Sequence, residues 1–319
     1  MKLNVGEMSL PPKVFIVGVR GFIGSALRSW LEAHNVTVYG IDTRAPEASA
    51  QTWSIDVHDD DAIKSVLARC DPDVIFQLVG VAGITDEALL WNSYVTATHS
   101  LLYAVQAACP LARIVILGSA AEYGSHIVSA NGSIAEEQYA LPEIAYGKAK
   151  LAQSTLAQEL GLELGLDVIR TRLFNTLGPG QGRHLVGGAM VGRLHEMLSR
   201  DETIFEVYDP ESERDYLDVR DVARLLWLVA TEAESFAQQP PIQIASGEAT
   251  RVLDLARFLL DAAGASHQVK IKPVQTHQPT RYVGRPTTLQ QLLGKRPIRE
   301  FSVKHSLHDM WQWQTGQVL

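Results

Sequence analysis

Hydrophobic and polar positions follow two different patterns that alternate along the first half of the chain. Short β-branched runs predict strands at Val14–Val17, Thr37–Ile41, Val74–Leu78, Ile114–Leu117 and Val168–Thr171. Between them, longer amphipathic patterns predict helices at Phe22–His34, Asp60–Arg69, Glu87–Ala108 and Ile144–Leu164. Strands that alternate with helices are typical of βαβ units in a parallel sheet. The pattern therefore predicts an α/β fold of the Rossmann type, with a doubly wound parallel sheet.

The rhythm changes after Asn175. An irregular connection is predicted by Gly178, Pro179, Gly180 and Gly182, and the elements that follow are shorter and separated by Pro and Gly clusters. We expect a first domain over residues 11–175, to which segments at about 214–246 return. Residues 176–213 and 247–319 are expected to form a smaller α/β C-terminal domain.

Composition narrows the kinds of partner. The 319 residues carry a formal charge of −8, whereas phosphate backbones need clustered Lys and Arg, so we expect no nucleic-acid partner. No apolar run reaches the ~20 residues that span a bilayer, and Met1–Pro12 lacks the apolar core of a signal peptide, so we expect no membrane association and a cytoplasmic location. Cys70 and Cys109 are too few for a disulfide framework or a zinc site, and no metal is expected.

A glycine-rich turn follows the first predicted strand. Residues 13–24 read K-V-F-I-V-G-V-R-G-F-I-G, so an apolar strand leads through three glycines into an amphipathic helix. The first glycine permits a tight turn, the second lets the backbone approach a pyrophosphate, and the third lets the helix pack against the strand. Free N–H groups at the helix start then hold the anion. The candidate dinucleotide-binding residues of this turn are Gly18, Arg20, Gly21, Phe22, Ile23 and Gly24.

An acidic residue follows at a spacing that suits this motif. Asp42 closes the second predicted strand, about 24 residues after Gly18, where a carboxylate can accept both hydroxyls of a ribose. Its charge disfavours the 2′-phosphate of NADP, whereas Arg20 and Arg44 can neutralise one. We therefore expect NAD as the cofactor, with NADP possible.

The candidate catalytic residues come from two places in the chain. Tyr146 and Lys150 lie four residues apart in A-Y-G-K-A-K-L, so on a helix both side chains point from one face. A lysine ammonium lowers the pKa of a nearby phenol, which lets the tyrosine exchange a proton with a carbonyl oxygen, and it can also bind a nicotinamide ribose. Ser119 follows the strand Ile114–Leu117, whose end faces the ligand crevice of an open parallel sheet. A hydroxyl there can hold the reacting oxygen.

Five motifs are spread from Val14 to Ala230: G-V-R-G-F-I-G, L-G-S-A-A-E-Y-G, Y-G-K-A-K, R-L-F-N-T-L-G-P-G-Q and R-D-Y-L-D-V-R-D-V-A. Together they resemble the extended short-chain dehydrogenases of the NAD-dependent epimerase/dehydratase family. Within that family, G-P-G-Q followed by R-D-Y-L-D-V-R-D-V most resembles GDP-4-keto-6-deoxy-mannose reductases. The resemblance implies that the first domain binds the dinucleotide, that the smaller domain binds a nucleotide-diphosphate sugar, and that Ser119, Tyr146 and Lys150 act beside the nicotinamide.

The resemblance also implies further cofactor contacts. Asp56 and Val57 stand where this architecture contacts adenine, although Asp56 can equally be the N-cap of the helix predicted from Asp60. The segment after the third predicted strand replaces the usual His-Leu-Ala-Ala with Gln77, Leu78, Val79 and Gly80. Its candidate cofactor-binding residues are Leu78, Val79 and Gly80.

Candidate substrate residues lie in the second half of the chain. The resemblance places Asn175, Arg214 and Asp218 near the nucleotide diphosphate. Arg214 and Arg281 are the best candidates for pyrophosphate contacts, because a guanidinium matches phosphate oxygens in a bidentate fork. Each can instead form a surface ion pair.

Departures from the family pattern bear on the reaction. Dehydratases of this group carry an acidic residue close after the serine, but Ala120 and Ala121 occupy those places, so dehydration is not expected. Glu122 is expected to be structural, because a shift of one residue turns its side chain away. Tyr94 stands where an asparagine is common. His184 is expected to be a loop histidine, with an acid–base role as the alternative.

The resemblance, together with these residues, therefore implies an NAD(P)-dependent enzyme that acts at C4 of a nucleotide-diphosphate sugar, and a 4-keto-6-deoxyhexose reductase is the first expectation. A 4-epimerase with tightly bound NAD would use the same residues twice, first to oxidise C4 and then to return the hydride to the opposite face. A dinucleotide-sensing protein without turnover is a distant alternative, which the intact set of Ser119, Tyr146 and Lys150 disfavours.

Two long helical patterns predict a homodimer. Glu87–Ala108 and Ile144–Leu164 exceed the usual helix length and carry apolar residues beyond one stripe, including Tyr103 and Ala152. One face of each helix can cover the sheet, and a two-fold axis can pair the outer faces in a four-helix bundle. The alternative is that these residues thicken the core of the monomer.

Overall fold

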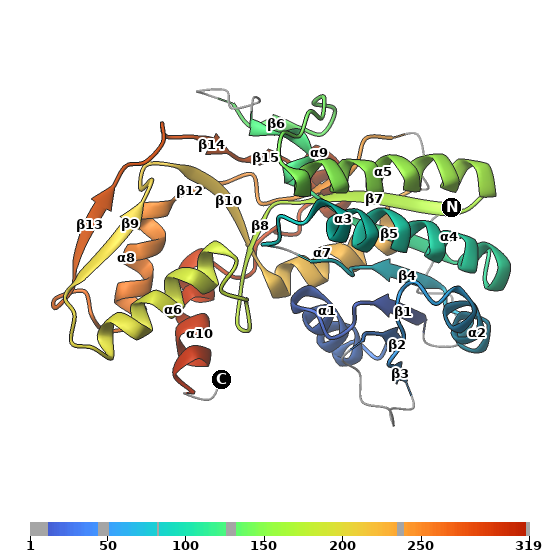
Figure 1. The fold of residues 1–319 in the computed structure, drawn as a ribbon, viewed down its shortest axis with the longest axis horizontal. Coiled ribbons are helices and arrows are strands. Elements are labelled where there is room, and N and C mark those ends of the chain that lie inside the picture. The colour runs from blue at the N-terminus through green and yellow to red at the C-terminus, as the bar shows by residue number, and fades with distance from the viewer. Residues whose placement is uncertain (1–11, 44–50, 82, 126–131, 235–238, 317–319) are drawn as a thin grey trace.

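The computed structural model describes residues 12–43, 51–81, 83–125, 132–234 and 239–316, which form two lobes (Figure 1). The larger lobe is built on a seven-stranded sheet in which all neighbouring strands are parallel. The order across it is β11 (Ile242–Ile244), β7 (Asp167–Leu173), β5 (Arg113–Ser119), β4 (Val74–Gln77), β1 (Lys13–Val17), β2 (Thr37–Ile41) and β3 (Thr52–Trp53). The direction of winding reverses between β1 and β4. The predicted doubly wound parallel sheet is confirmed.

Helices cover both faces of this sheet. One face carries α1 (Phe22–Ala33), α7 (Val219–Glu232) and α9 (Thr287–Leu293), and the other carries α2 (Asp60–Cys70), α4 (Ala97–Ala108) and α5 (Ala145–Leu164). Successive residues of a strand point to opposite faces, so Val14 packs in the same core as Leu27 of α1, and Phe15 in the same core as Leu101 of α4. Burial on both faces explains why the strands are almost continuously apolar.

The smaller lobe has a core of its own. Its elements are α6 (Val186–Leu198), α8 (Val252–Ala262), α10 (Val303–Thr315), the parallel pair β9 (Ile204–Tyr208) and β13 (Lys270–Val274), and β10 (Glu213–Asp218) with its partners β8 (Asn175–Leu177), β12 (Ala249–Arg251) and β14 (Arg281–Tyr282). Leu194, Leu255 and Leu307 bring the three helices together in this core. A short parallel pair, β6 (Ile134–Ala135) and β15 (Gly284–Arg285), joins distant parts of the chain. The chain therefore crosses between the lobes several times.

The segment predicted as a helix over Glu87–Ala108 contains a π-helical turn. The short α3 (Glu87–Trp91) and α4 are separated by a π-helical turn, Asn92–Thr96, in which Tyr94 is buried. A π turn differs from an α turn by a single residue, which the spacing of apolar residues does not reveal. The predicted segment Glu87–Ala108 is therefore helical from end to end, with a π turn that the pattern did not predict. No helix within the described residues is long and apolar enough to cross a membrane.

Candidate active site

The carboxyl ends of β1 and β4 form a cradle at the point where the winding of the sheet reverses, which is where open parallel sheets bind ligands. Gly18 leaves β1 with a φ of +89°, a left-handed conformation that favours glycine. A β-carbon on Gly18 would lie 3.0 Å from the amide nitrogen of Val79, and one on Gly24 would collide with the Gly18 carbonyl oxygen. The close approach of three backbone segments therefore requires the glycines of the motif.

Helix α1 begins at this cradle with an N-terminus suited to an anion. Gly21 is its N-cap and supplies no side-chain hydrogen bond, and the first turn contains no acidic residue. The first N–H groups of a helix have no partner within the helix, and the helix dipole adds a partial positive charge. This twelve-residue helix thus fits the pyrophosphate of a dinucleotide, with Phe22 and Ile23 partly buried in its first turn.

Asp42 lies at the same edge of the sheet, directly after β2. Its side chain is 8% exposed, and Oδ2 accepts a hydrogen bond from the Arg20 amide at 3.1 Å. This bond holds the carboxylate beside the glycine turn, a position that fits a ribose of the dinucleotide. The Arg20 side chain is exposed, whereas Arg44 lies outside the described residues.

The adenine candidates Asp56 and Val57 follow β3. Asp56 is exposed, and its Oδ1 accepts a hydrogen bond from the His58 amide at 3.0 Å. The N-cap of α2 is Asp59, whose Oδ1 accepts from the Ala62 amide at 3.0 Å. The alternative that Asp56 caps this helix was therefore wrong, because the helix begins directly after Asp59. Val57 is partly buried and packs against the core on the α2 side of the sheet.

Ser119, Tyr146 and Lys150 gather at the carboxyl end of β5. Ser119 is the last residue of this strand, and its Oγ accepts a hydrogen bond from the Ala121 amide at 3.2 Å. Tyr146 and Lys150 lie in the first two turns of α5. Nζ of Lys150 donates to the carbonyl oxygen of Leu117 at 2.7 Å, which ties α5 to β5. The fold thus brings together residues from two separate motifs.

Burial governs the protonation of these groups. It raises the pKa of the Tyr146 phenol, and hydrogen bonding with Ser119 offsets part of the rise. Burial lowers the pKa of the Lys150 amine to about 7, against the opposing attraction of the Glu122 carboxylate. Near neutral pH the phenol therefore keeps its proton, while the amine lies close to its titration midpoint.

Close contacts join the cradle to the catalytic residues. The backbone at Val79 approaches Gly18, and the next residue, Gly80, lies against the ring of Tyr94. The rings of Tyr94 and Tyr146 form a T-shaped pair with centroids 5.8 Å apart. The candidate segment Leu78, Val79 and Gly80 therefore lies between the glycine turn and the catalytic tyrosine.

The substrate candidates lie where strands of the smaller lobe pair. Asn175 on β8 donates through Nδ2 to the carbonyl oxygen of Asp215 at 3.1 Å. Arg214 on β10 donates to two backbone carbonyl oxygens, each at 2.9 Å. Arg281 on β14 forms an ion pair with Glu213, which is the alternative that the sequence left open. Both arginines are partly exposed, but Arg281 is the register partner of Glu213 and Arg214 that of Tyr282, so the two side chains leave opposite faces of the β10–β14 pair. The structure therefore does not bring these two predicted phosphate ligands together.

Two further candidates have other surroundings. Asp218 is buried as the N-cap of α7, where it accepts hydrogen bonds from the Arg220 amide at 2.9 Å and from Ser306 Oγ at 2.6 Å. These contacts fix an end of α7 to α10, so we do not carry Asp218 into the site. His184 is exposed in the loop before α6, beside Gly83.

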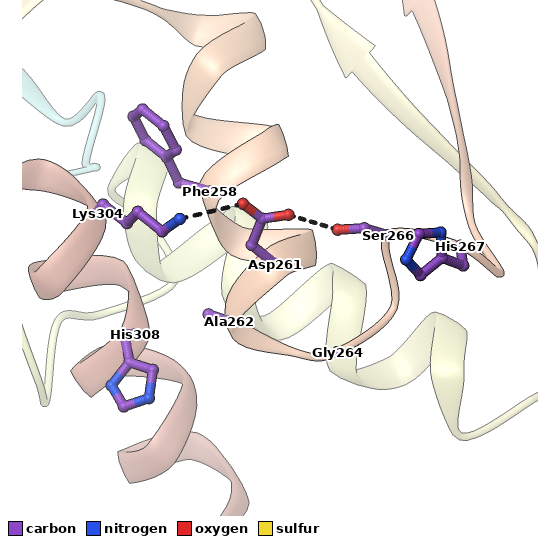
Figure 2. Close-up of a pocket in the computed structure, with 8 residues that line it drawn as sticks. All are labelled: Phe258, Asp261, Ala262, Gly264, Ser266, His267, Lys304 and His308. Atoms are coloured by element: carbon purple, nitrogen blue, oxygen red, sulfur yellow. Dashed lines mark hydrogen bonds and ion pairs between the residues drawn. The ribbon is translucent and has the colours of Figure 1, made fainter.

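Two open cavities lie outside the catalytic centre. Figure 2 shows one of about 350 Å³ between α8 and α10, in which Asp261 accepts a hydrogen bond from Ser266 at 2.6 Å and pairs with Lys304 at 3.3 Å. The other, of about 300 Å³, lies between the loop 178–183, the first part of α6 and the end of α10 at Trp313. Neither is lined by Tyr146 or Lys150. Within the described residues, no group of three or more His, Cys, Asp or Glu is arranged to hold a metal ion.

Comparison with known proteins gives this geometry its context. A family model described as the NAD dependent epimerase/dehydratase family matches residues 14–245. The chain belongs to this family. Among its relatives is a dTDP-6-deoxy-L-talose 4-dehydrogenase (NAD(P)(+)) from Kitasatospora kifunensis, 28% identical, with 96% of each chain covered. Another is a GDP-6-deoxy-D-mannose reductase from Pseudomonas aeruginosa, 24% identical over 92% of this chain and 94% of the relative.

Solved structures of similar fold include proteins with bound cofactor. RMD from Pseudomonas aeruginosa, complexed with NADPH, has a TM-score of 0.80 at 24% identity and covers 96% of this chain and 100% of its own. The UDP-glucose 4-epimerase of Thermus thermophilus, complexed with NAD, has a TM-score of 0.79 at 21% identity, with 96% and 100% covered. The predictions of the family, the fold and an NAD(P)-dependent enzyme are confirmed.

Glu122 is a structural residue that supports Ser119 from below, through contacts that the sequence analysis did not predict. It is fully buried, and Oε1 accepts a hydrogen bond from the Ser119 amide at 2.8 Å while Oε2 pairs with Nε of Arg172 at 2.8 Å. These contacts agree with the expectation that Glu122 is structural: the side chain folds back beneath Ser119 in a capping box of the turn Ala120–Tyr123. The Ser-x-x-Glu spacing was the available signal. Gly118 is needed here, since a β-carbon would collide with this carboxylate.

Proposed function

We propose that this enzyme is an NAD(P)-dependent reductase that acts at C4 of a nucleotide-diphosphate-linked 4-keto-6-deoxyhexose. The observation that carries the proposal is the gathering of Ser119, Tyr146 and Lys150 beside the glycine cradle. The names of two relatives support the substrate class, since one is a 4-dehydrogenase of dTDP-6-deoxy-L-talose and the other a GDP-6-deoxy-D-mannose reductase. Ala120 and Ala121 supply no acid close behind the serine, which favours reduction over elimination.

The catalytic residues have complementary tasks in this reaction. When bound, NAD(P)H supplies the hydride for the C4 carbon. Tyr146 donates its proton to the C4 oxygen, and its raised pKa keeps the phenol protonated beforehand. Ser119 donates a hydrogen bond to the same oxygen and so stabilises the charge that develops on it. Lys150, in its ammonium form, favours the phenolate that Tyr146 leaves behind.

The surrounding residues hold the two ligands. We assign the pyrophosphate of the cofactor to the start of α1 at Gly21 and a ribose to Asp42. We assign the diphosphate of the sugar nucleotide to Arg214, because its guanidinium matches phosphate oxygens and it shares a face of the β10–β14 pair with Tyr282, whose hydroxyl donates to the carbonyl oxygen of Ala120. Asn175 on β8, another partner strand of β10, is the second candidate contact. Arg281 leaves the opposite face of the pair and is matched with Glu213, so we do not assign it to the diphosphate.

The test is a panel of 4-keto-6-deoxyhexoses linked to dTDP, GDP or UDP, offered with NADH or NADPH. We expect the absorbance of the reduced nicotinamide to fall in step with formation of a new C4 hydroxyl, identified by NMR. If no member of the panel oxidises either cofactor, the proposed reduction is wrong.

A 4-epimerase is the second candidate, because its chemistry uses the same three residues in both directions. A dTDP-L-rhamnose 4-epimerase from Burkholderia thailandensis is 26% identical, with 79% of this chain and 82% of the relative covered. An epimerase would interconvert C4 isomers without added reduced cofactor, and NAD would be released when the purified protein is denatured. A strict requirement for added NADH or NADPH excludes this candidate.

We further propose a homodimer through the outer faces of α3, α4 and α5. Trp91, Tyr103 and Leu162 on these helices are about half exposed, whereas Leu101 and Leu160 belong to the monomer core. Pairing these faces across a two-fold axis would bury the exposed rings. Light scattering should report about twice the chain mass of 35.0 kDa. Trp91→Glu should shift the mass toward the monomer, while Trp313→Glu on α10, the matched control, should not.

A further inference from the structure

Tyr94 touches both residues of the catalytic pair from outside their helix. Its side chain, in the π-helical turn, is 3% exposed. Its ring makes a T-shaped contact with Tyr146, with the planes at 76°, and Nζ of Lys150 lies 4.0 Å from its centroid. One ring therefore contacts the phenol that transfers the proton and the cation that supports it.

The hydroxyl of Tyr94 is anchored separately from the ring. It donates a hydrogen bond to the carbonyl oxygen of Val81, in the segment that follows β4. Burial raises the pKa of Tyr94 well above its usual range, so the hydroxyl keeps its proton and remains a donor near neutral pH. Tyr94 thus links the catalytic pair on α5 to the segment that borders the dinucleotide cradle.

Gly80 makes room for this ring. A β-carbon at Gly80 would collide with Cε1 of Tyr94 and lie 2.7 Å from Cζ. Gly80 is not among the glycines with positive φ, so its backbone conformation does not require glycine. The neighbouring ring does, and the two positions therefore form a matched pair.

We propose that Tyr94 is a positioning residue that holds Tyr146 and Lys150 in their reactive arrangement, and that Gly80 is glycine so that the Tyr94 ring can reach them. The inference rests on the proposed function only in taking Tyr146 and Lys150 as the proton-transfer pair. Three side chains from different elements face the Lys150 amine: Glu122 from the turn after β5, Tyr94 from the π turn, and Gln153 from α5 itself.

The first test follows Lys150 directly and needs no substrate. In protein labelled with ¹³C at lysine Cε, one resonance should titrate well below the others, and Lys150→Arg should remove it. Tyr94→Leu should lower its midpoint by about one pH unit, because the ring face that stabilises the ammonium is lost. Tyr94→Phe retains the ring and is the matched control, so the midpoint should stay within about 0.3 units of wild type. An unchanged or raised midpoint in Tyr94→Leu overturns the proposal.

The second test separates positioning from simple packing. Gly80→Ala should reduce kcat at least ~10-fold in the wild-type background, because the methyl group displaces the ring, but less than ~2-fold in the Tyr94→Leu background. Additive losses in this double-mutant cycle would show that the two positions act independently and would overturn the matched pair. If a variant is too slow to assay, the Lys150 titration midpoint replaces kcat in the cycle. It is then measured for the wild type, the two single variants and the double variant.

The outcomes also distinguish this inference from the proposed reaction. If no nucleotide sugar is reduced or epimerised but the lysine midpoint moves as expected, the proposed function fails and the positioning role stands. If turnover is found but neither the midpoint nor the cycle shows coupling, the positioning role fails alone. Thermal unfolding of each variant identifies a loss that is due to misfolding. If Tyr94→Leu misfolds, Tyr94→Met, which also removes the ring, replaces it in the cycle with Gly80→Ala: coupling between them supports the role, and additivity overturns it.

Discussion

The proposed dinucleotide cradle and the proposed catalytic centre lie at the same edge of one sheet, but the first is built mainly from backbone and the second from side chains. The cradle is almost entirely backbone: Gly18, Gly24 and the start of α1, with one carboxylate from Asp42. The catalytic centre is built from buried ionisable side chains, of which Lys150 and the ion pair of Glu122 with Arg172 are the most enclosed.

This difference has energetic consequences. Backbone N–H groups carry no net charge, so a backbone site binds an anion without burying an ionised side chain. A centre made of buried charges depends on every partner, because removal of one leaves the other unpaired in a medium of low dielectric constant. Changes at the cradle should therefore weaken ligand binding locally, whereas changes at the centre should alter both catalysis and the free energy of unfolding.

The largest effect should come from Tyr146→Phe. Loss of the proton donor should reduce kcat by at least ~100-fold, while NAD(H) affinity stays nearly unchanged because the cradle is untouched. Steady-state kinetics measures the change in kcat, and cofactor titration measures the affinity for NAD(H). Tyr139→Phe, at an exposed tyrosine shortly before α5, should retain wild-type turnover. Normal turnover in Tyr146→Phe would remove the residue from the mechanism.

Glu122→Gln should show that the centre supports the fold as well as the reaction. The buried guanidinium of Arg172 would lose its counter-charge, at a cost of about 3–5 kcal/mol in the free energy of unfolding. Urea titration measures this loss. Glu32→Gln breaks the exposed pair with Arg28 and, as the control, should cost less than about 0.5 kcal/mol. Equal stability of the two variants would contradict the comparison drawn here.

Lys150→Met should reveal a stability that depends on pH. Because the pKa of Lys150 is lowered to about 7 from an ordinary value of 10.5, its burial costs stability that is fully present below pH 7 and disappears as the pH rises toward 10.5. The variant should therefore be more stable than wild type by about 2–4 kcal/mol at pH 6, and the difference should shrink at pH 10. Denaturant unfolding at both pH values checks this, and a difference that grows with pH would contradict the assignment.

The smallest effect should come from the cradle. Asp42→Ala should weaken NAD binding by about 1–3 kcal/mol through loss of hydrogen bonds to the ribose. It should also reduce the difference between the affinities for NAD and NADP. Calorimetric titration with both cofactors measures the two affinities. The free energy of unfolding should change little in comparison with Glu122→Gln. An equal loss for NAD and NADP would show that Asp42 does not read the ribose.

The fold of the larger lobe could be predicted because its signals are local. Each main strand is a short apolar run buried on both faces, and each helix has a 3.6-residue period. The two-residue β3 is too short to give such a signal, and the smaller lobe is assembled from short strands separated by long stretches of chain. The π turn at Asn92–Thr96 adds one residue to a single turn of the helix, and the spacing of apolar residues cannot resolve so small a difference.

The candidate site also contains residues that the sequence predicts and residues that only the folded structure reveals. The glycine turn and the pair Tyr146 and Lys150 are visible because their members are near in sequence. The pairing of Glu122 with Arg172 is not, because it depends on the register of β5 with β7, in which Gly118 is the partner of Arg172. The fit of Tyr94 against Gly80 likewise requires the packed structure.

The repeated crossing of the chain between the lobes also constrains the order in which the protein can fold during synthesis. Strand β7 ends at Leu173, but its outer neighbour β11 and the covering helix α9 are translated only with residues 242–244 and 287–293. The edge of β7 stays unpaired in the nascent chain until then, and unpaired edges are where misassociation begins. A fragment ending near Asn175 should therefore aggregate rather than fold. The sheet that carries the dinucleotide cradle can be completed only after nearly the whole polypeptide has left the ribosome.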